Sequence, residues 1–206
     1  MDVGAYSSGE DAEYVLGQPN FTTSTAATTQ SGMHYPEGLT LDSVNNRLFV
    51  GDTGNNRVLA FNVPVSANGV NASYVLGQSS WTTATTATTQ AGMYYPCGVS
   101  YDPNSLRLFV ADGYNNRILV FNVPPGGFTP LANGMNPSFV LGQSSYTVHT
   151  ANTTQAGLDL DASTELNSCN VRYDPGSGRV FAADSANNRI MIFEGSFLPS
   201  WPADIP

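Results

Sequence analysis

Lysine is absent from this sequence of 206 residues, and all seven basic residues are arginines. Sixteen Asp and Glu residues bring the net charge to −9. Nucleic-acid binding depends on basic side chains that displace counterions from phosphates, so this balance predicts no nucleic-acid partner. An anionic membrane surface repels the chain for the same reason, and no apolar run approaches the roughly 20 residues that span a bilayer. We therefore expect neither a nucleic acid nor a membrane among the partners.

Cysteine and histidine are also scarce, with two residues of each. Two cysteines are too few for the disulfide framework of a small secreted domain, and the sequence has no His-rich zinc spacing. Residues 1–11 are polar and acidic, so we expect no secretory signal peptide in this chain. Three N-x-S/T sequons, at Asn20, Asn71 and Asn152, fit an extracytoplasmic protein. The localisation stays open, with an extracytoplasmic or secreted site favoured.

Two motifs recur three times along the chain, and they define its organisation. The first is (Tyr/Phe)-Val-Leu-Gly-Gln at residues 14–18, 74–78 and 139–143, and the second is Asp-x-x-Asn-Asn-Arg at residues 52–57, 112–117 and 184–189. The first two units align without a gap at a shift of 60 residues (74 − 14), whereas the third has an insertion between Gln155 and Cys169. The sequence therefore predicts one repeat domain over residues 1–206, with units at about 14–73, 74–138 and 139–195.

Each unit is expected to form four strands. In the first unit these are Leu39–Asp42, Arg47–Asp52, Val58–Val63 and Ser73–Gly77, which are apolar, branched or aromatic runs between breaker residues. Residues 53–56 suit a hairpin in which Gly or Asn takes a positive φ. No segment shows a convincing 3.6-residue stripe, so the fold is predicted to be all-β. Strands that are apolar on both faces suit sheets packed between neighbouring sheets.

The first unit is also similar to a known repeat. Pro36-x-Gly-Leu, Asp42, Arg47-Leu-Phe-Val-x-Asp52 and Asn-Asn-Arg57-Val-Leu-x-Phe61 together resemble the NHL repeat, with Tyr-Val-Leu-Gly-Gln as its outer strand. The second unit matches equally well, and the third departs at residues 168–170 and 193–195. The resemblance implies a β-propeller with three four-stranded blades in this chain.

The order of the strands suggests how such a ring would close. After Phe193 no fourth Val-Leu-Gly-Gln follows, so the last blade lacks its outer strand, whereas Tyr14–Gly17 is an outer strand without a blade. Propellers have roughly four to eight blades, and closed symmetric dimers are the commonest oligomers. We therefore expect a homodimer that forms a six-bladed ring by strand exchange. The alternative is that the chain is part of a longer array of blades.

The Asp-x-x-Asn-Asn-Arg turns are predicted to be structural. An Arg side chain presents a planar fork that suits bidentate pairing with a carboxylate, and such pairs recur here in every unit. The residues concerned are Asp52, Asn56, Arg57, Asp112, Asn116, Arg117, Asp184, Asn188 and Arg189.

The candidate ligand-binding residues are those that differ between equivalent positions of the repeats. At the entrance to the innermost strand, near one mouth of the expected channel, the chain carries His34, Glu37, Cys97, Cys169, Asn170 and Arg172. These residues suit a ligand or metal, although a cysteine there is also explained as a small buried residue. In the insertion, Asp159 and Asp161 are spaced like the opening of a calcium loop. That loop lacks the expected Gly and the bidentate Glu, so no cofactor is predicted and an acidic solvated loop is favoured over calcium.

Two functions remain open at this point. The repeated turns and sparse charge favour a non-catalytic module that self-associates and binds a protein, peptide or glycan. The alternative is an enzyme, because the fold resembles six-bladed propellers with metal-assisted lactonase or lyase chemistry. In that case Glu37 and Asn170 would be oxygen ligands and Arg172 an anion clamp at the channel mouth. A fold does not choose between such functions.

Overall fold

The computed structural model describes residues 8–125, 131–160 and 169–194, which form three antiparallel sheets and no α-helix. Sheet 1 consists of β1 (Pro36–Asp42), β2 (Arg47–Asp52), β3 (Arg57–Asn62) and β4 (Tyr74–Leu76). Sheet 2 consists of β5 (Pro96–Asp102), β6 (Arg107–Asp112), β7 (Arg117–Asn122) and β8 (Phe139–Leu141). Sheet 3 consists of β9 (Val171–Asp174), β10 (Arg179–Asp184) and β11 (Arg189–Glu194). The all-β prediction is confirmed.

The outermost strand of each four-stranded sheet comes from the start of the next repeat. β4 pairs with β3, with Val75 opposite Leu59, and β8 pairs with β7, with Val140 opposite Leu119. In the part of the chain that the structure describes, sheet 3 has no such fourth strand and β11 is its edge. The predicted order, in which the outer strand comes from the start of the next repeat, is confirmed for sheets 1 and 2.

Tyr14–Gly17 was predicted to be an outer strand, but in the single chain it is not one. Among the described residues, its one strand-type pairing is an isolated parallel bridge between Gly17 and Gly32. The physical reason is that a strand needs a neighbour that accepts and donates its backbone hydrogen bonds. The described chain places no counterpart of β3 beside residues 14–17.

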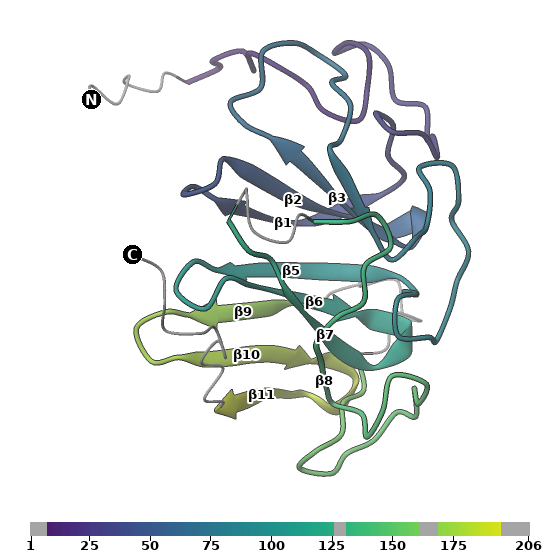
Figure 1. The fold of residues 1–206 in the computed structure, drawn as a ribbon, viewed down its shortest axis with the longest axis vertical. Helices are drawn as coiled ribbons and strands as arrows, with labels where there is room; N and C mark the ends of the chain where they lie inside the picture. Colours follow the sequence, from purple (N-terminus) through teal and green to yellow (C-terminus); the bar gives the residue numbers. More distant parts are fainter. Residues whose placement is uncertain (1–7, 126–130, 161–168, 195–206) are drawn as a thin grey trace.

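The three sheets are stacked, with sheet 2 between sheets 1 and 3 (Figure 1). One apolar cluster fills the space between sheets 1 and 2 and includes Phe49, Val58, Tyr101 and Leu119. A second fills the space between sheets 2 and 3 and includes residues of β6, β7, β9 and β10. Sheet 2 is thus buried on both faces, which explains why β6 and β7 are almost continuously apolar.

A short 3₁₀ turn joins the second and third strands of each sheet. The turns are η1 (Thr53–Asn55), η2 (Gly113–Asn115) and η3 (Ser185–Asn187). Each is followed by an asparagine in the left-handed region, with φ between 50° and 53°. Asparagine tolerates this region better than other side chains. The predicted hairpin is confirmed, with Asn rather than Gly at the positive φ.

Candidate functional site

The turn at residues 112–117 is held by a buried ion pair. The Arg117 Nε donates to Asp112 Oδ2 at 2.8 Å, and neither side chain is exposed to solvent. The other Asp112 oxygen accepts the backbone N–H of Tyr94 at 2.6 Å. Burial raises the pKa of the Asp112 carboxyl, although the Arg117 guanidinium acts in the opposite direction. The same arrangement joins Arg57 to Asp52 and Arg189 to Asp184, so all three pairs fill structural positions.

Each turn contacts the threonine-rich segment that precedes its own sheet. We call these segments wrap 1 (residues 18–35), wrap 2 (residues 78–95) and wrap 3 (residues 143–160). The Asn55 Nδ2 donates to the carbonyl of Ala27 at 2.9 Å in wrap 1, and the hydroxyl of Thr28 donates to Asn55 Oδ1 at 2.7 Å. The Arg57 Nη2 donates to the carbonyls of Thr29 and Gly32. Equivalent bonds occur at Asn115 and Asn187.

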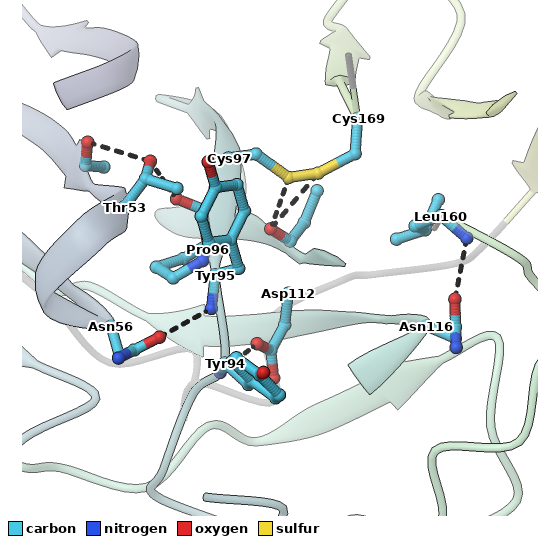
Figure 2. The surroundings of a disulfide bond; sticks show 12 residues. Thr53, Asn56, Tyr94, Tyr95, Pro96, Cys97, Asp112, Asn116, Leu160 and Cys169 are labelled. Atoms are coloured by element: carbon cyan, nitrogen blue, oxygen red, sulfur yellow. Dashed lines mark hydrogen bonds between the residues drawn. A yellow bond between two sulfur atoms is a disulfide. The ribbon is translucent and has the colours of Figure 1, made fainter. Parts of the chain in front are cut away.

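The next asparagine of each turn binds the wrap of the following unit. The Asn56 Nδ2 donates to the carbonyl of Ala84 at 3.0 Å. Figure 2 shows the second contact, in which Asn56 Oδ1 accepts the backbone N–H of Tyr95 at 2.9 Å. The carbonyl of Asn56 accepts Gln78 Nε2 at 3.0 Å. Asn56 therefore connects sheet 1 to wrap 2 through both its side chain and its backbone.

Asn116 repeats this connection between sheet 2 and wrap 3. Its Nδ2 donates to the carbonyl of His149 at 3.1 Å, its Oδ1 accepts the backbone N–H of Leu160 at 2.8 Å, and its carbonyl accepts Gln143 Nε2 at 2.9 Å. Asn56 and Asn116 are both buried. The junction between successive units thus has a fixed set of three hydrogen bonds around one asparagine.

Asn188 is the third member of the series, and its side chain is exposed. No wrap follows it among the described residues, and its backbone N–H bonds only to Ser185 within the turn. At the other end of the chain, Gln18 Nε2 donates to the carbonyl of Thr25 but lacks the second acceptor that Gln78 and Gln143 have. Gln18 and Asn188 thus lack contacts that their equivalents make within the chain.

Wrap 1 also contains a cavity at the position where a turn would bind. The cavity has a volume of about 410 Å³ and is lined by Leu16, Gly17, Gln18, Thr23, Ser24, Ala26, Met33, His34, Tyr35 and Pro36. The equivalent residues of wrap 2 include Gln78, Ala84 and Tyr95, which bind Asn56. We call this cavity the socket. In wrap 2 the equivalent position is occupied by the turn that ends at Asn56.

The outer faces of sheets 1 and 3 carry exposed apolar side chains. On β1, Leu39 is 67% exposed and Leu41 54%, whereas Val99 and Tyr101, their equivalents on β5, are buried. On β11, Ile190 is 61% exposed and Ile192 is 53% exposed, whereas the equivalent residues of β3 and β7 are buried. Sheets 1 and 3 therefore each expose a face that is buried between sheets elsewhere in the chain.

The apolar cluster on the outward face of sheet 1 is smaller than the cluster between sheets 1 and 2. A third apolar cluster joins Val50, Leu59 and Phe61 of this sheet to Leu16 and Met33, which occupy the positions of Leu76 and Met93. The cluster between sheets 1 and 2 contains the equivalent residues of sheet 2. It also contains Phe49, Val58 and Ala60, which sheet 1 contributes from the opposite side. By the repeat, the missing layer corresponds to Phe181, Ile190 and Ile192 of sheet 3.

The channel-mouth residues lie in three different environments. Cys97 and Cys169 form a disulfide with a Cα–Cα distance of 5.8 Å, which joins sheet 2 to sheet 3 (Figure 2). Their interpretation as thiol ligands is therefore wrong, because both sulfurs are used in the bond. Glu37 is exposed on β1, and partial desolvation raises the pKa of its carboxyl while a hydrogen bond with Tyr95 opposes this effect. Asn170 and Arg172 are exposed on the far side of sheet 3.

The remaining candidate ligands do not converge. The backbone N–H of His34 donates to Asp52 Oδ1 at 2.7 Å, and the His34 ring lies against Tyr35 in a tilted arrangement with 4.5 Å between centroids. Asp159 donates its backbone N–H to Asp184, and Asp161 lies outside the described residues. Among the residues that the structure places, no group of three His, Cys, Asp or Glu side chains is arranged to hold a metal ion. No helix in the same residues is long and apolar enough to cross a membrane.

Two tyrosines of the inner strands connect neighbouring sheets. Burial and the negative charge of Asp42 raise the pKa of Tyr101 to about 12, and burial together with Asp102 has the same effect on Tyr173. The Tyr173 ring stacks on Phe109 of sheet 2 with 5.5 Å between centroids. These phenols stay neutral at ordinary pH and act as packing groups between sheets.

Sequence reasoning located the turns but did not predict the two different contacts of their asparagines. Asn55 and Asn56 are adjacent, and only the fold shows that one binds its own wrap and the other the next wrap. A signal for this division was available, because both asparagines recur in all three units. The disulfide was not predicted, although its two cysteines hold equivalent positions in successive repeats.

Comparisons with known proteins agree with the repeat. A model of the NHL repeat matches the sequence at residues 33–61 and 93–121. No curated protein matches the sequence. Similar solved structures include the WD40 β-propeller domain of Doa1, at 11% identity and a TM-score of 0.45 over 82% of this chain and 41% of that one. Kuenenia stuttgartiensis hydrazine synthase matches at 10% identity and a TM-score of 0.45, over 79% of this chain and 46% of that one. The chain thus spans less than half the length of either structure.

Proposed function

We propose that this chain, which carries NHL repeats in a β-propeller fold, is a non-catalytic interaction module whose first partner is a second copy of itself. The socket in wrap 1 is the observation that carries this proposal. In the two junctions within the chain, the equivalent position binds an asparagine turn. Residues 185–188 form that turn in sheet 3, and their Asn188 side chain is exposed.

Ring closure follows if the turn of one copy enters the socket of the other. Two copies supply six sheets, within the roughly four to eight blades of known propellers, and three copies would supply nine. A two-fold axis then generates two identical junctions. Asn188 would accept the backbone N–H of Tyr35 and donate to Ser24 of the other copy, as Asn56 does with Tyr95 and Ala84.

Strand exchange would complete sheet 3 in the same step. Residues 14–16 already contact residues 68–69 in the way that β4 contacts residues 133–134. Val15 accepts the backbone N–H of Gly69 at 2.9 Å and donates to Asn68 Oδ1, as Val75 does with Gly134 and Asn133. By the register of β3 with β4, Val15 would lie opposite Met191 of the other copy, and Leu16 opposite Ile190. This pairing would give partners to the free backbone N–H and C=O groups of β11, an exposed edge strand that otherwise promotes aggregation.

Further partners would bind the assembled module. Each wrap encloses a smaller cavity lined by Gly, Gln and Thr, with volumes of about 380, 260 and 350 Å³ in wraps 1, 2 and 3. Hydroxyl and amide groups of this kind suit a glycan or an extended peptide. We keep a protein, peptide or glycan as the second class of partner. The lactonase- or lyase-like alternative assigns Glu37 and Asn170 as oxygen ligands and Arg172 as an anion clamp, and all three side chains are exposed.

The oligomeric state tests the proposal. We expect a dimer of about twice 21.8 kDa by light scattering. Ile192→Asp should convert it to a folded monomer, because the substitution is exposed in the single chain but would bury an unpaired charge in the ring. Deletion of residues 1–18 should have the same effect, because it removes the exchanged strand.

Val44→Asp is the matched control. Val44 is also apolar and is 71% exposed, but it lies in the β1–β2 hairpin, away from the proposed junction. This variant should remain dimeric. A wild-type protein that is monomeric at all concentrations would overturn ring closure and favour the longer array. A dimer that tolerates Ile192→Asp would show that another surface mediates association.

A further inference from the structure

The innermost strands of the three sheets are β1, β5 and β9. Successive side chains on each of them face the neighbouring sheets on opposite sides. The backbone N–H of Tyr101 on β5 donates to Thr40 Oγ1 on β1 at 3.1 Å, and the N–H of Tyr173 on β9 donates to Ser100 Oγ on β5 at 2.9 Å. Side chains at the positions of Thr40 and Ser100 therefore point at the next sheet. Arg172 holds this position on β9, where it is exposed and faces the place that a further sheet would occupy.

Asn170 makes this face different from the other two. A Cβ on Gly38 would lie 2.7 Å from the carbonyl oxygen of Cys97, and a Cβ on Gly98 would lie 2.9 Å from the backbone N of Val171. Glycine is thus what allows the inner strands of sheets 1, 2 and 3 to approach closely. Sheet 3 carries Asn170 at the equivalent position, so the next inner strand must lie farther away. Longer side chains are needed to bridge that gap.

Arg172 and Glu37 are side chains of the right length and opposite charge. Arg47, Arg57, Arg117, Arg179 and Arg189 each pair with a carboxylate of the chain. No interaction of the Arg172 side chain is seen with the residues that the structure describes. Glu37 occupies the position of Cys97 and Cys169, which lie 5.8 Å apart between Cα atoms. The next sheet in a closed ring would therefore place Glu37 beside Cys169.

The spacing along β9 brings the two charges within reach. Arg172 lies three residues beyond Cys169, which is about 10 Å along an extended strand. An Arg and a Glu side chain together span that distance. The side-chain volumes on the two facing strands also compensate. Arg172 is larger than Ser100 and Thr40, which hold the equivalent position on β5 and β1. The side chain that would face it, Leu41 on β1, is smaller than its equivalents Tyr101 and Tyr173. The Arg172 stem can pack on Leu41 while its guanidinium stays polar.

We propose that Arg172 of one copy pairs with Glu37 of the other at the channel mouth, and that this pair makes the association selective for a second copy of the chain. The inference rests on the proposed ring closure. It assigns Glu37 and Arg172 to the junction between copies rather than to a bound ligand. Each copy contributes one member to each of the two junctions, so the dimer contains the pair twice.

Charge exchange between two variants tests the pair. In Glu37→Arg alone each junction opposes two arginines, and in Arg172→Glu alone it opposes two glutamates. Each variant should raise the dissociation constant of the dimer by at least about a hundredfold over its two junctions. In an equimolar mixture of the two variants, one junction regains the native pair and the other has it reversed. The mixture should therefore dimerise with a dissociation constant within about tenfold of wild type.

The readout is light scattering of each variant and of the mixture, with near-UV circular dichroism to confirm folding. Raising the salt concentration should weaken the wild-type dimer, because a partly exposed ion pair is screened. Variants that dimerise as wild type does, or a mixture that fails to recover, would overturn the pair while leaving ring closure intact. A wild-type protein that does not dimerise would overturn both proposals.

Discussion

Replacing Arg117 by alanine is expected to lower the free energy of unfolding by about 3–5 kcal/mol, because the change leaves the Asp112 carboxylate buried and unpaired. Arg117 also donates to the carbonyls of Thr89 and Gly92 in wrap 2 and of Tyr146 in wrap 3. Those carbonyls would lose this donor, and Asp112 would keep only the neutral donors Tyr94 N–H and Asn115 Nδ2. Urea denaturation followed by circular dichroism measures the change.

Arg179→Ala is the matched control for this prediction. Arg179 also pairs with a carboxylate, Glu194 at 2.6 Å, but the two side chains are 46% and 70% exposed. Exposed pairs contribute little, so this variant should lose less than about 1 kcal/mol. Equal losses in the two variants would contradict the structural role of the Asp-x-x-Asn-Asn-Arg turns. If Arg117→Ala instead lost ligand or partner binding at an unchanged free energy of unfolding, that result would also contradict the structural role.

Reducing the Cys97–Cys169 disulfide is expected to lower the free energy of unfolding by about 4 kcal/mol. The two cysteines lie 72 residues apart, and the bond restricts the conformations of the unfolded chain, so breaking it raises the entropy of the unfolded state and favours unfolding. The effect is measured by urea denaturation with and without a thiol reductant. Disulfide bonds persist in oxidising compartments.

The double variant Cys97→Ser/Cys169→Ser provides the control. It should be as unstable as the reduced wild type, and reductant should not change it further. A thiol assay on the unfolded, unreduced protein should detect no free thiol, since the described residues contain no unpaired cysteine. Two reactive thiols per chain, together with no effect of reductant, would show that the cysteines are unpaired in solution.

Much of the architecture could be predicted because its causes are local. The run Arg47–Asp52 is mostly apolar and lies between two segments of turn residues, and it forms β2 with these bounds. The Asp-x-x-Asn-Asn-Arg motif identified the turns because Asn56 takes the left-handed conformation from its own side-chain preference. Recurrence in three units then gave the stacking of the sheets, since each unit has two apolar faces to bury.

Only the tertiary structure decided which of these residues meet. The sequence placed Cys97 and Cys169 at one channel mouth, but their pairing depends on an approach of 5.8 Å between two sheets. Tyr14–Leu16 has the composition of β4 and yet forms no strand, because a strand depends on its neighbour as well as on its own residues. Asn188 has the same sequence context as Asn56 but lacks a wrap to bind, so the fold exposes it together with Ile190 and Ile192. Contacts between distant segments, rather than local preference, thus determined where the candidate site lies.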